Sequence, residues 1–199
     1  LTREPSEKPS PTKDDSVSLE DVVEKPGPIF VVPGRGEPKV LLMVGAAILG
    51  AAVVAAALHA KPTLAGVFAT GISTIYWTLL LTITGVSAVG VAAHLSGAPY
   101  GRVDLAAARM FVTVAACQLI LSIRFAALGN WNGAVIAPIA LGVYWLTLWA
   151  LFRLPRQRQV ALASTHFALS LLIWGIMSLH VWVVTTSAEA AAVPPPTAP

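Results

Sequence analysis

Histidine is the residue type in this chain best suited to hold a cofactor. Four histidines lie within or beside apolar segments: His59, His94, His166 and His180. His166 and His180 are fourteen residues apart, which on a helix is about 21 Å of rise and about 40° short of four full turns. These two side chains therefore share one face of a helix. If each apolar segment crosses a bilayer, His59 and His180 fall toward one membrane surface, and His94 and His166 toward the other.

This spacing resembles the histidine spacing of di-haem b-type cytochromes, which implies two bis-histidine haem b sites and electron transfer. The usual pattern has histidine pairs on two helices, whereas only one helix carries a pair here. His166 also lies about five residues deeper than His94, a mismatch of about 8 Å for one haem. We therefore predict interfacial histidines and no cofactor. In the alternative hypothesis, four histidines bind haem b: His59, His94, His166 and His180.

Residue patterns of soluble enzymes are missing from the sequence. Cys117 is the only cysteine, so no cysteine pair can hold zinc. The glycines of residues 32–36 lack the lysine and hydroxyl residue of a phosphate-binding loop. No aspartate or glutamate lies inside an apolar segment, which argues against a carboxylate proton relay. We predict that the protein has no catalytic residue and no metal site, and is not an enzyme.

A stripe of hydroxyl side chains, Thr70, Thr74, Thr78 and Thr82, recurs every four residues. Hydroxyls at this spacing can bond to carbonyl oxygens of the preceding turn and then need no other partner. The stripe could instead line a path for a small solute, so a transporter is a further alternative. The stripe drifts by about 40° per step around a helix, and this winding favours the first interpretation.

Five apolar segments position these residues. The chain is 56% hydrophobic and 12% charged, and charged residues are rare after residue 39. A helix needs about 20 apolar residues to cross a hydrocarbon core of ~30 Å. The sequence therefore predicts an all-α polytopic membrane protein, a bundle of five transmembrane helices within residues 39–188. The predicted spans are 40–60, 66–95, 105–128, 131–152 and 159–186.

The two ends of the chain differ from this domain in composition. Residues 1–38 contain seven of the 15 prolines and eight of the ten acidic residues, which predicts a disordered tail. Within this tail, we expect the apolar residues 29–32 to touch the membrane surface. The Ala/Pro-rich residues 189–199 predict a second disordered tail.

Positive charges predict the orientation of the bundle, because Lys and Arg are enriched in cytoplasmic loops. Seven Lys and Arg residues near the ends of the predicted spans lie at one side of the predicted membrane. Two, Lys61 and Arg124, lie at the other side. The seven are Arg35, Lys39, Arg102, Arg109, Arg153, Arg156 and Arg158. We expect Arg109 and Arg124 to extend to opposite headgroup layers. The amino terminus is predicted to be cytoplasmic and the carboxyl terminus outside the cell membrane. This boundary role of the basic residues also argues against a nucleic-acid partner. The initial Leu1 suggests a fragment or, from a non-AUG start codon, a bacterial gene.

Residues 83–179 resemble the membrane domain of the Yip family. The matching features are the loop at 97–102 (GAPYGR), the helix start at 105–110 (LAAARM) and the segment from Tyr144-Trp145 to 151–154 (LFRL). This resemblance implies five spans, an inward amino terminus and no known catalytic residues. We predict a non-enzymatic membrane protein that acts through helix–helix or partner contacts. Its expected partners are the lipid bilayer and a membrane protein or a second copy of the chain.

Overall fold

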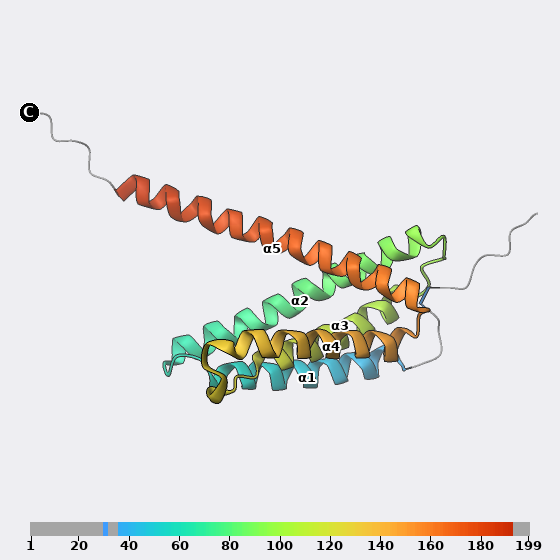
Figure 1. Cartoon of the computed structure of the whole chain (residues 1–199), viewed down its shortest axis with the longest axis horizontal. Helices are drawn as coiled ribbons and strands as arrows, with labels where there is room; N and C mark the ends of the chain where they lie inside the picture. Colours follow the sequence, from blue (N-terminus) through green and yellow to red (C-terminus); the bar gives the residue numbers. More distant parts are fainter. Residues whose placement is uncertain (1–29, 32–35, 193–199) are drawn as a thin grey trace, which may run out of the picture.

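Five helices in the described part of the chain are long and apolar enough to cross a membrane (Figure 1). The computed structural model describes residues 30–31 and 36–192. The helices are α1 (Pro38–Leu58), α2 (Leu64–Leu95), α3 (Val103–Ser122), α4 (Asn132–Phe152) and α5 (Arg156–Ala192), and the 3₁₀ segment η2 (Ala126–Trp131) precedes α4. This confirms the predicted all-α membrane bundle. The chain is a multi-pass integral membrane protein.

Local chemistry sets several helix ends. Pro38 opens α1, where a missing N–H costs nothing. Thr63 caps α2, and its hydroxyl oxygen accepts a 3.1 Å hydrogen bond from the Gly66 N–H. Arg153 ends α4 in the left-handed conformation, with φ of 48°, and Pro155 then precedes α5. Helices α1, α2, α3 and α5 begin two or three residues earlier than predicted.

The third span is shorter than predicted. It was expected to run to residue 128, but α3 ends at Ser122 and Ile123 is extended. The chain then turns through η2, in which Gly129 has a φ of 47°. The apolar run continues through these residues, so hydropathy did not mark the end of the helix. The fourth span begins at Asn132, one residue later than predicted.

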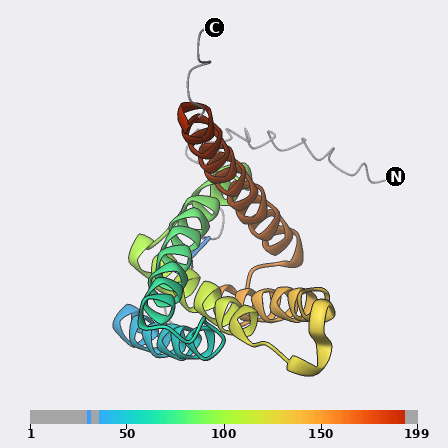
Figure 2. The same cartoon turned by 90° about the vertical axis from the view of Figure 1, so that its left-hand side faces the viewer.

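Helix α3 lies at the centre of the bundle and contacts α1, α2 and α4. Helix α5 contacts α2 and, more briefly, α4. Its carboxyl-terminal part extends away from the other helices (Figures 1 and 2). Half of the most apolar stretch of α3 is buried, whereas none of that stretch of α5 is. The chain therefore surrounds α3 and leaves α5 largely uncovered.

Small residues allow α2 and α3 to approach closely. A Cβ at Gly85 would overlap the methyl group of Met110, so this crossing accepts only glycine unless Met110 moves. The buried face of α2 continues this pattern with Gly71, Thr74, Thr78, Ala88 and Ala92. Small residues at helix contacts are the usual way in which helices pack in lipid, where no hydrophobic force drives them together.

The apolar core lies at the end of the bundle where α2 meets α3, and it includes Phe30 and Val31, which we call the N-terminal strap. Both residues are 0% exposed. The Phe30 N–H donates to the Pro99 carbonyl at 2.9 Å, and the Val31 N–H to the Tyr100 carbonyl at 3.2 Å. The expectation that these two residues touch the membrane surface was wrong, because they are enclosed by the bundle.

The strap also changes the predicted domain boundary at residue 38. Phe30 and Val31 belong to the bundle, although they fall within the predicted amino-terminal tail. The other residues of that tail, up to residue 35, lie outside the described residues. At the other end, α5 continues to Ala192, past the predicted limit of the span at 186 and past the start of the predicted tail at 189. Residues 193–199 lie outside the described part.

Candidate functional site

The structure separates the four histidines. His166 is buried on α5, whereas the other three are exposed. His59 caps the end of α1 and His94 lies in the last turn of α2. His180 lies on the part of α5 that no other helix covers. Only His166 is therefore placed to make contacts inside the bundle.

Both ring nitrogens of His166 are engaged by other helices. Nε2 lies 3.0 Å from the carbonyl oxygen of Leu81 on α2. Because a carbonyl oxygen only accepts, Nε2 must carry the proton and donate it. Nδ1, 2.6 Å from the hydroxyl oxygen of Tyr144 on α4, then accepts a hydrogen bond from that hydroxyl. In the neutral imidazole these contacts select a single tautomer, and they join α2, α4 and α5 through one side chain.

The surroundings of His166 fit this role. The Leu81 carbonyl also accepts a hydrogen bond from the Thr84 hydroxyl at 2.8 Å. A Cβ at Gly85 would lie 3.4 Å from the imidazole ring, so the absence of a side chain there makes room for the ring. The ring centroids of Tyr144 and His166 are 5.5 Å apart. We call His166, Tyr144 and the Leu81 carbonyl the histidine contact.

The sequence reasoning missed Tyr144 as a partner of His166. Its hydroxyl is one of the few polar groups of α4, and in the sequence Tyr144 stands out only as part of the family resemblance. A buried tyrosine hydroxyl usually finds a hydrogen-bond partner. That rule marks Tyr144 as a residue that needs a partner, although it does not name the partner.

The structure does not bring the histidines together as two haem ligand pairs. His59 and His180 lie on α1 and α5, and these two helices make no contact. His166 packs at the level of Gly85 on α2, and His94 lies nine residues farther along that helix, roughly 13 Å away. Within the described ranges, no three His, Cys, Asp or Glu side chains gather where they could hold a metal ion. These residues therefore do not fit two bis-histidine sites.

A second group of buried polar residues lies near the core. Arg109 is 3% exposed, and its guanidinium carbon lies 5.7 Å from the centroid of the Phe152 ring on α4, a cation–π contact. Gln159, also buried, donates from Nε2 to the Trp145 carbonyl at 3.1 Å. The expectation that Arg109 extends to the headgroup layer was wrong. The end of α4 covers its side chain.

The hydroxyl stripe of α2 bonds within its own helix. Thr74, Thr78 and Thr82 each donate to the carbonyl oxygen four residues earlier, at 2.9, 2.8 and 2.7 Å. Thr74 and Thr78 are buried against neighbouring helices. This is the local bonding that the spacing indicated. The hydroxyls of Thr74, Thr78 and Thr82 are therefore occupied by the backbone.

The fold and these contacts define a five-span integral membrane protein whose buried polar groups join its own helices. Comparisons of the chain with protein-family models, curated proteins and solved structures gave no match. A functional proposal therefore depends on the geometry of the chain itself.

Proposed function

We propose that the protein is a non-enzymatic, Yip-family-like membrane protein that acts, without a cofactor, by binding a second copy or another membrane protein through α5. One observation carries this proposal. None of the most apolar stretch of α5 is buried by the chain, whereas half of that stretch of α3 is. A helix left open by its own bundle is the element best placed to meet another helix.

The buried polar groups support a structural role for the bundle interior. His166 and Gln159 make hydrogen bonds to other parts of the chain, and Arg109 packs on Phe152. Buried polar groups in a membrane commonly mark function when they face a cavity, but these three join helices instead. We therefore place the activity on the surface of the bundle.

One feature of the structure supports the Yip-like part of this proposal. The number of spans matches that implied by the resemblance. The resemblance also implies an inward amino terminus, which the positive charges favour.

Gly175 on α5 offers a sharp test of this surface. A Cβ built there meets nothing within 4 Å, so a side chain at this position clashes with no part of the chain. Small residues let two membrane helices approach closely. A large side chain at Gly175 should therefore block a partner helix and leave the fold unchanged.

We predict that Gly175→Leu weakens association by at least about tenfold, or ~1.4 kcal/mol. Energy transfer between donor- and acceptor-labelled copies in lipid vesicles measures binding of a second copy. Co-purification from native membranes measures binding of another protein. The matched control is Gly142→Leu on α4, where an added Cβ also meets nothing within 4 Å. A wild-type protein that is monomeric and unaccompanied in both assays, or an equal effect of the two variants, would contradict the proposal.

A further inference from the structure

A pocket of about 570 Å³ lies at the end of the bundle opposite the apolar core. Its lining residues come from the end of α1, the end of α3 and the start of α4. The η2 segment connects α3 to α4 and contributes Gly129 to the lining. This volume is within the range of small-molecule sites. The pocket is distinct from α5 and from the histidine contact, so it is independent of the proposed function.

One guanidinium and one imidazole, from Arg124 and His59, line this pocket. They come from different parts of the fold, the end of α1 and the residues after α3. No described carboxylate pairs with Arg124. Beyond the first 38 residues the chain has only two acidic residues. Asp104 pairs with Arg102 at the other end, and Glu189 lies on α5, which contacts neither α1 nor α3. Within residues 36–192, Arg124 therefore brings a positive charge to the pocket that no described carboxylate neutralises.

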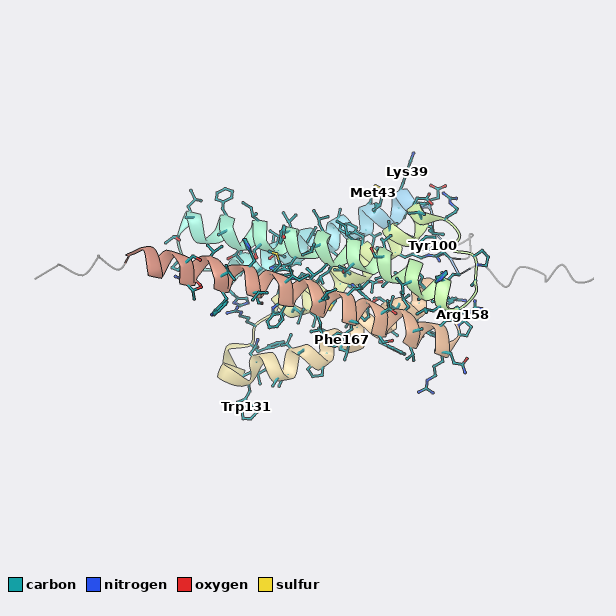
Figure 3. All side chains as sticks on the ribbon, turned by 90° about the horizontal axis from the view of Figure 1, so that it is seen from above. Lys39, Met43, Tyr100, Trp131, Arg158 and Phe167 are labelled. Carbon is teal, nitrogen blue, oxygen red and sulfur yellow. The ribbon has the colours of Figure 1, made fainter. Side chains whose placement is uncertain are left out.

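The rest of the lining is apolar or fixed in place. Leu121 and Phe125 supply apolar wall. The Asn132 Oδ1 accepts a 2.8 Å hydrogen bond from the Phe125 N–H, which holds the turn beside Arg124. Next to the pocket, the Trp131 side chain is 74% exposed and projects from the start of α4 (Figure 3). Indoles favour the membrane–water interface, and from Trp131 we infer that the pocket lies at headgroup level.

We propose that this pocket binds a phosphate group, as an anionic phospholipid headgroup or as a soluble phosphate ester. A guanidinium matches phosphate oxygens with two parallel hydrogen bonds. The His59 ring supplies a further nitrogen donor. The apolar wall of Leu121 and Phe125 suits the glycerol and upper acyl carbons of a lipid. An arginine that pairs with no described carboxylate, beside an apolar wall, is the combination that such a headgroup requires.

The test uses the full chain in nanodiscs that contain equal amounts of phosphatidylglycerol and phosphatidylcholine. Native mass spectrometry then counts the lipids that stay bound. The variants are Arg124→Gln and His59→Gln, and the matched control is Lys61→Gln. Lys61 is exposed at the same end but does not line the pocket. Melting temperatures equal to that of the wild type establish that each variant is folded.

We expect the wild type to retain phosphatidylglycerol in preference to phosphatidylcholine. Arg124→Gln should lower this retention by roughly tenfold, the factor for one lost charge-assisted hydrogen bond. His59→Gln should lower it less, and Lys61→Gln should leave it unchanged. A separate titration with glycerol 3-phosphate and with inorganic phosphate distinguishes the sources. Displacement of the lipid by either assigns the pocket to a soluble phosphate, and lack of displacement assigns it to a headgroup. Equal losses for Arg124→Gln and Lys61→Gln would overturn the proposal. So would a wild type that shows no preference for phosphatidylglycerol and binds neither glycerol 3-phosphate nor inorganic phosphate.

Discussion

The histidine contact shows how single polar atoms organise an apolar bundle. The Leu81 carbonyl, the His166 ring and the Tyr144 hydroxyl come from three helices and form one chain of hydrogen bonds. In a lipid environment each of these atoms would be costly without a partner. The contact therefore fixes the rotation of α4 and α5 relative to α2. Its role is to select one arrangement among helices whose apolar surfaces are otherwise similar.

We predict that Tyr144→Phe lowers the free energy of unfolding by about 1 kcal/mol, the usual scale of hydrogen bonds between membrane helices. The loss arises because Nδ1 of His166 is left without its donor. Reversible unfolding in mixed micelles measures the effect. The control is Tyr76→Phe, since Tyr76 is 47% exposed on α2 and should show almost no change.

A double-mutant cycle with His166→Leu tests whether the two residues act together. The cost of the double variant should be less than the sum of the single costs, because each single change leaves the other partner unsatisfied. Strict additivity would mean that Tyr144 and His166 stabilise the bundle independently, and would refute the histidine contact as a unit.

The sequence identified His166 as a candidate residue but could not supply its partners. Tyr144 is 22 residues away and Leu81 is 85 residues away. Pairing them requires the rotation of three helices, and apolar residues surround each helix on nearly every side. Lipid accepts those residues as readily as a neighbouring helix does. Hydropathy therefore predicts that these helices exist but not which of their faces meet.

At the scale of the elements, the spans were predictable because a bilayer requires a fixed length of apolar helix. Five runs of that length gave five helices. The end of α3 was not predictable, since the apolar run continues past Ser122 into η2. The N-terminal strap was missed for a different reason. The residues around it are charged and rich in proline, which suggested a separate tail. Its hydrogen bonds to the carbonyls of residues 99 and 100 are made by the backbone, so amino-acid composition does not predict them.

The strap makes truncation a test of where the folded unit begins. Removing residues 1–28 should leave the melting temperature unchanged, because the strap remains. Removing residues 1–35 should lower it, because two fully buried side chains and two backbone hydrogen bonds are lost. Within the full chain, Phe30→Ala should cost about 3 kcal/mol of unfolding free energy, as for other buried phenylalanines.

Phe68→Ala is the matched control for the strap, because the Phe68 side chain is 62% exposed on α2 and should lose far less. Thermal unfolding and limited proteolysis in detergent give the readout. All variants should still insert into the membrane, since the five apolar helices remain. If the two truncated proteins melt at the same temperature, the strap is not part of the folded unit.

At the scale of the whole molecule, the fold sorts the basic residues to two ends. Lys39, Arg102, Arg153, Arg156 and Arg158 lie where α1 begins, α2 meets α3 and α4 meets α5. Figure 3 shows Lys39 and Arg158 toward this end and Trp131 toward the other. Lys61 and Arg124 follow α1 and α3 at the opposite end. The unequal distribution of basic residues along the sequence therefore becomes an unequal distribution of positive charge between the two ends of the bundle.

This imbalance predicts that the end with Lys39 and Arg158 faces the cytoplasm, because basic loops are retained there during insertion. Alkaline phosphatase fused after Ala192 should be active in a bacterial host, since the odd number of spans places the end of α5 outside. The same enzyme fused within residues 153–155, on the basic side, should be inactive, and a fluorescent protein there should fold. Replacing Arg153, Arg156 and Arg158 by glutamine should reduce the activity of the first fusion by weakening the bias. Activity confined to the 153–155 fusion would reverse the orientation, and the phosphate pocket at Arg124 would then face the cytoplasmic leaflet.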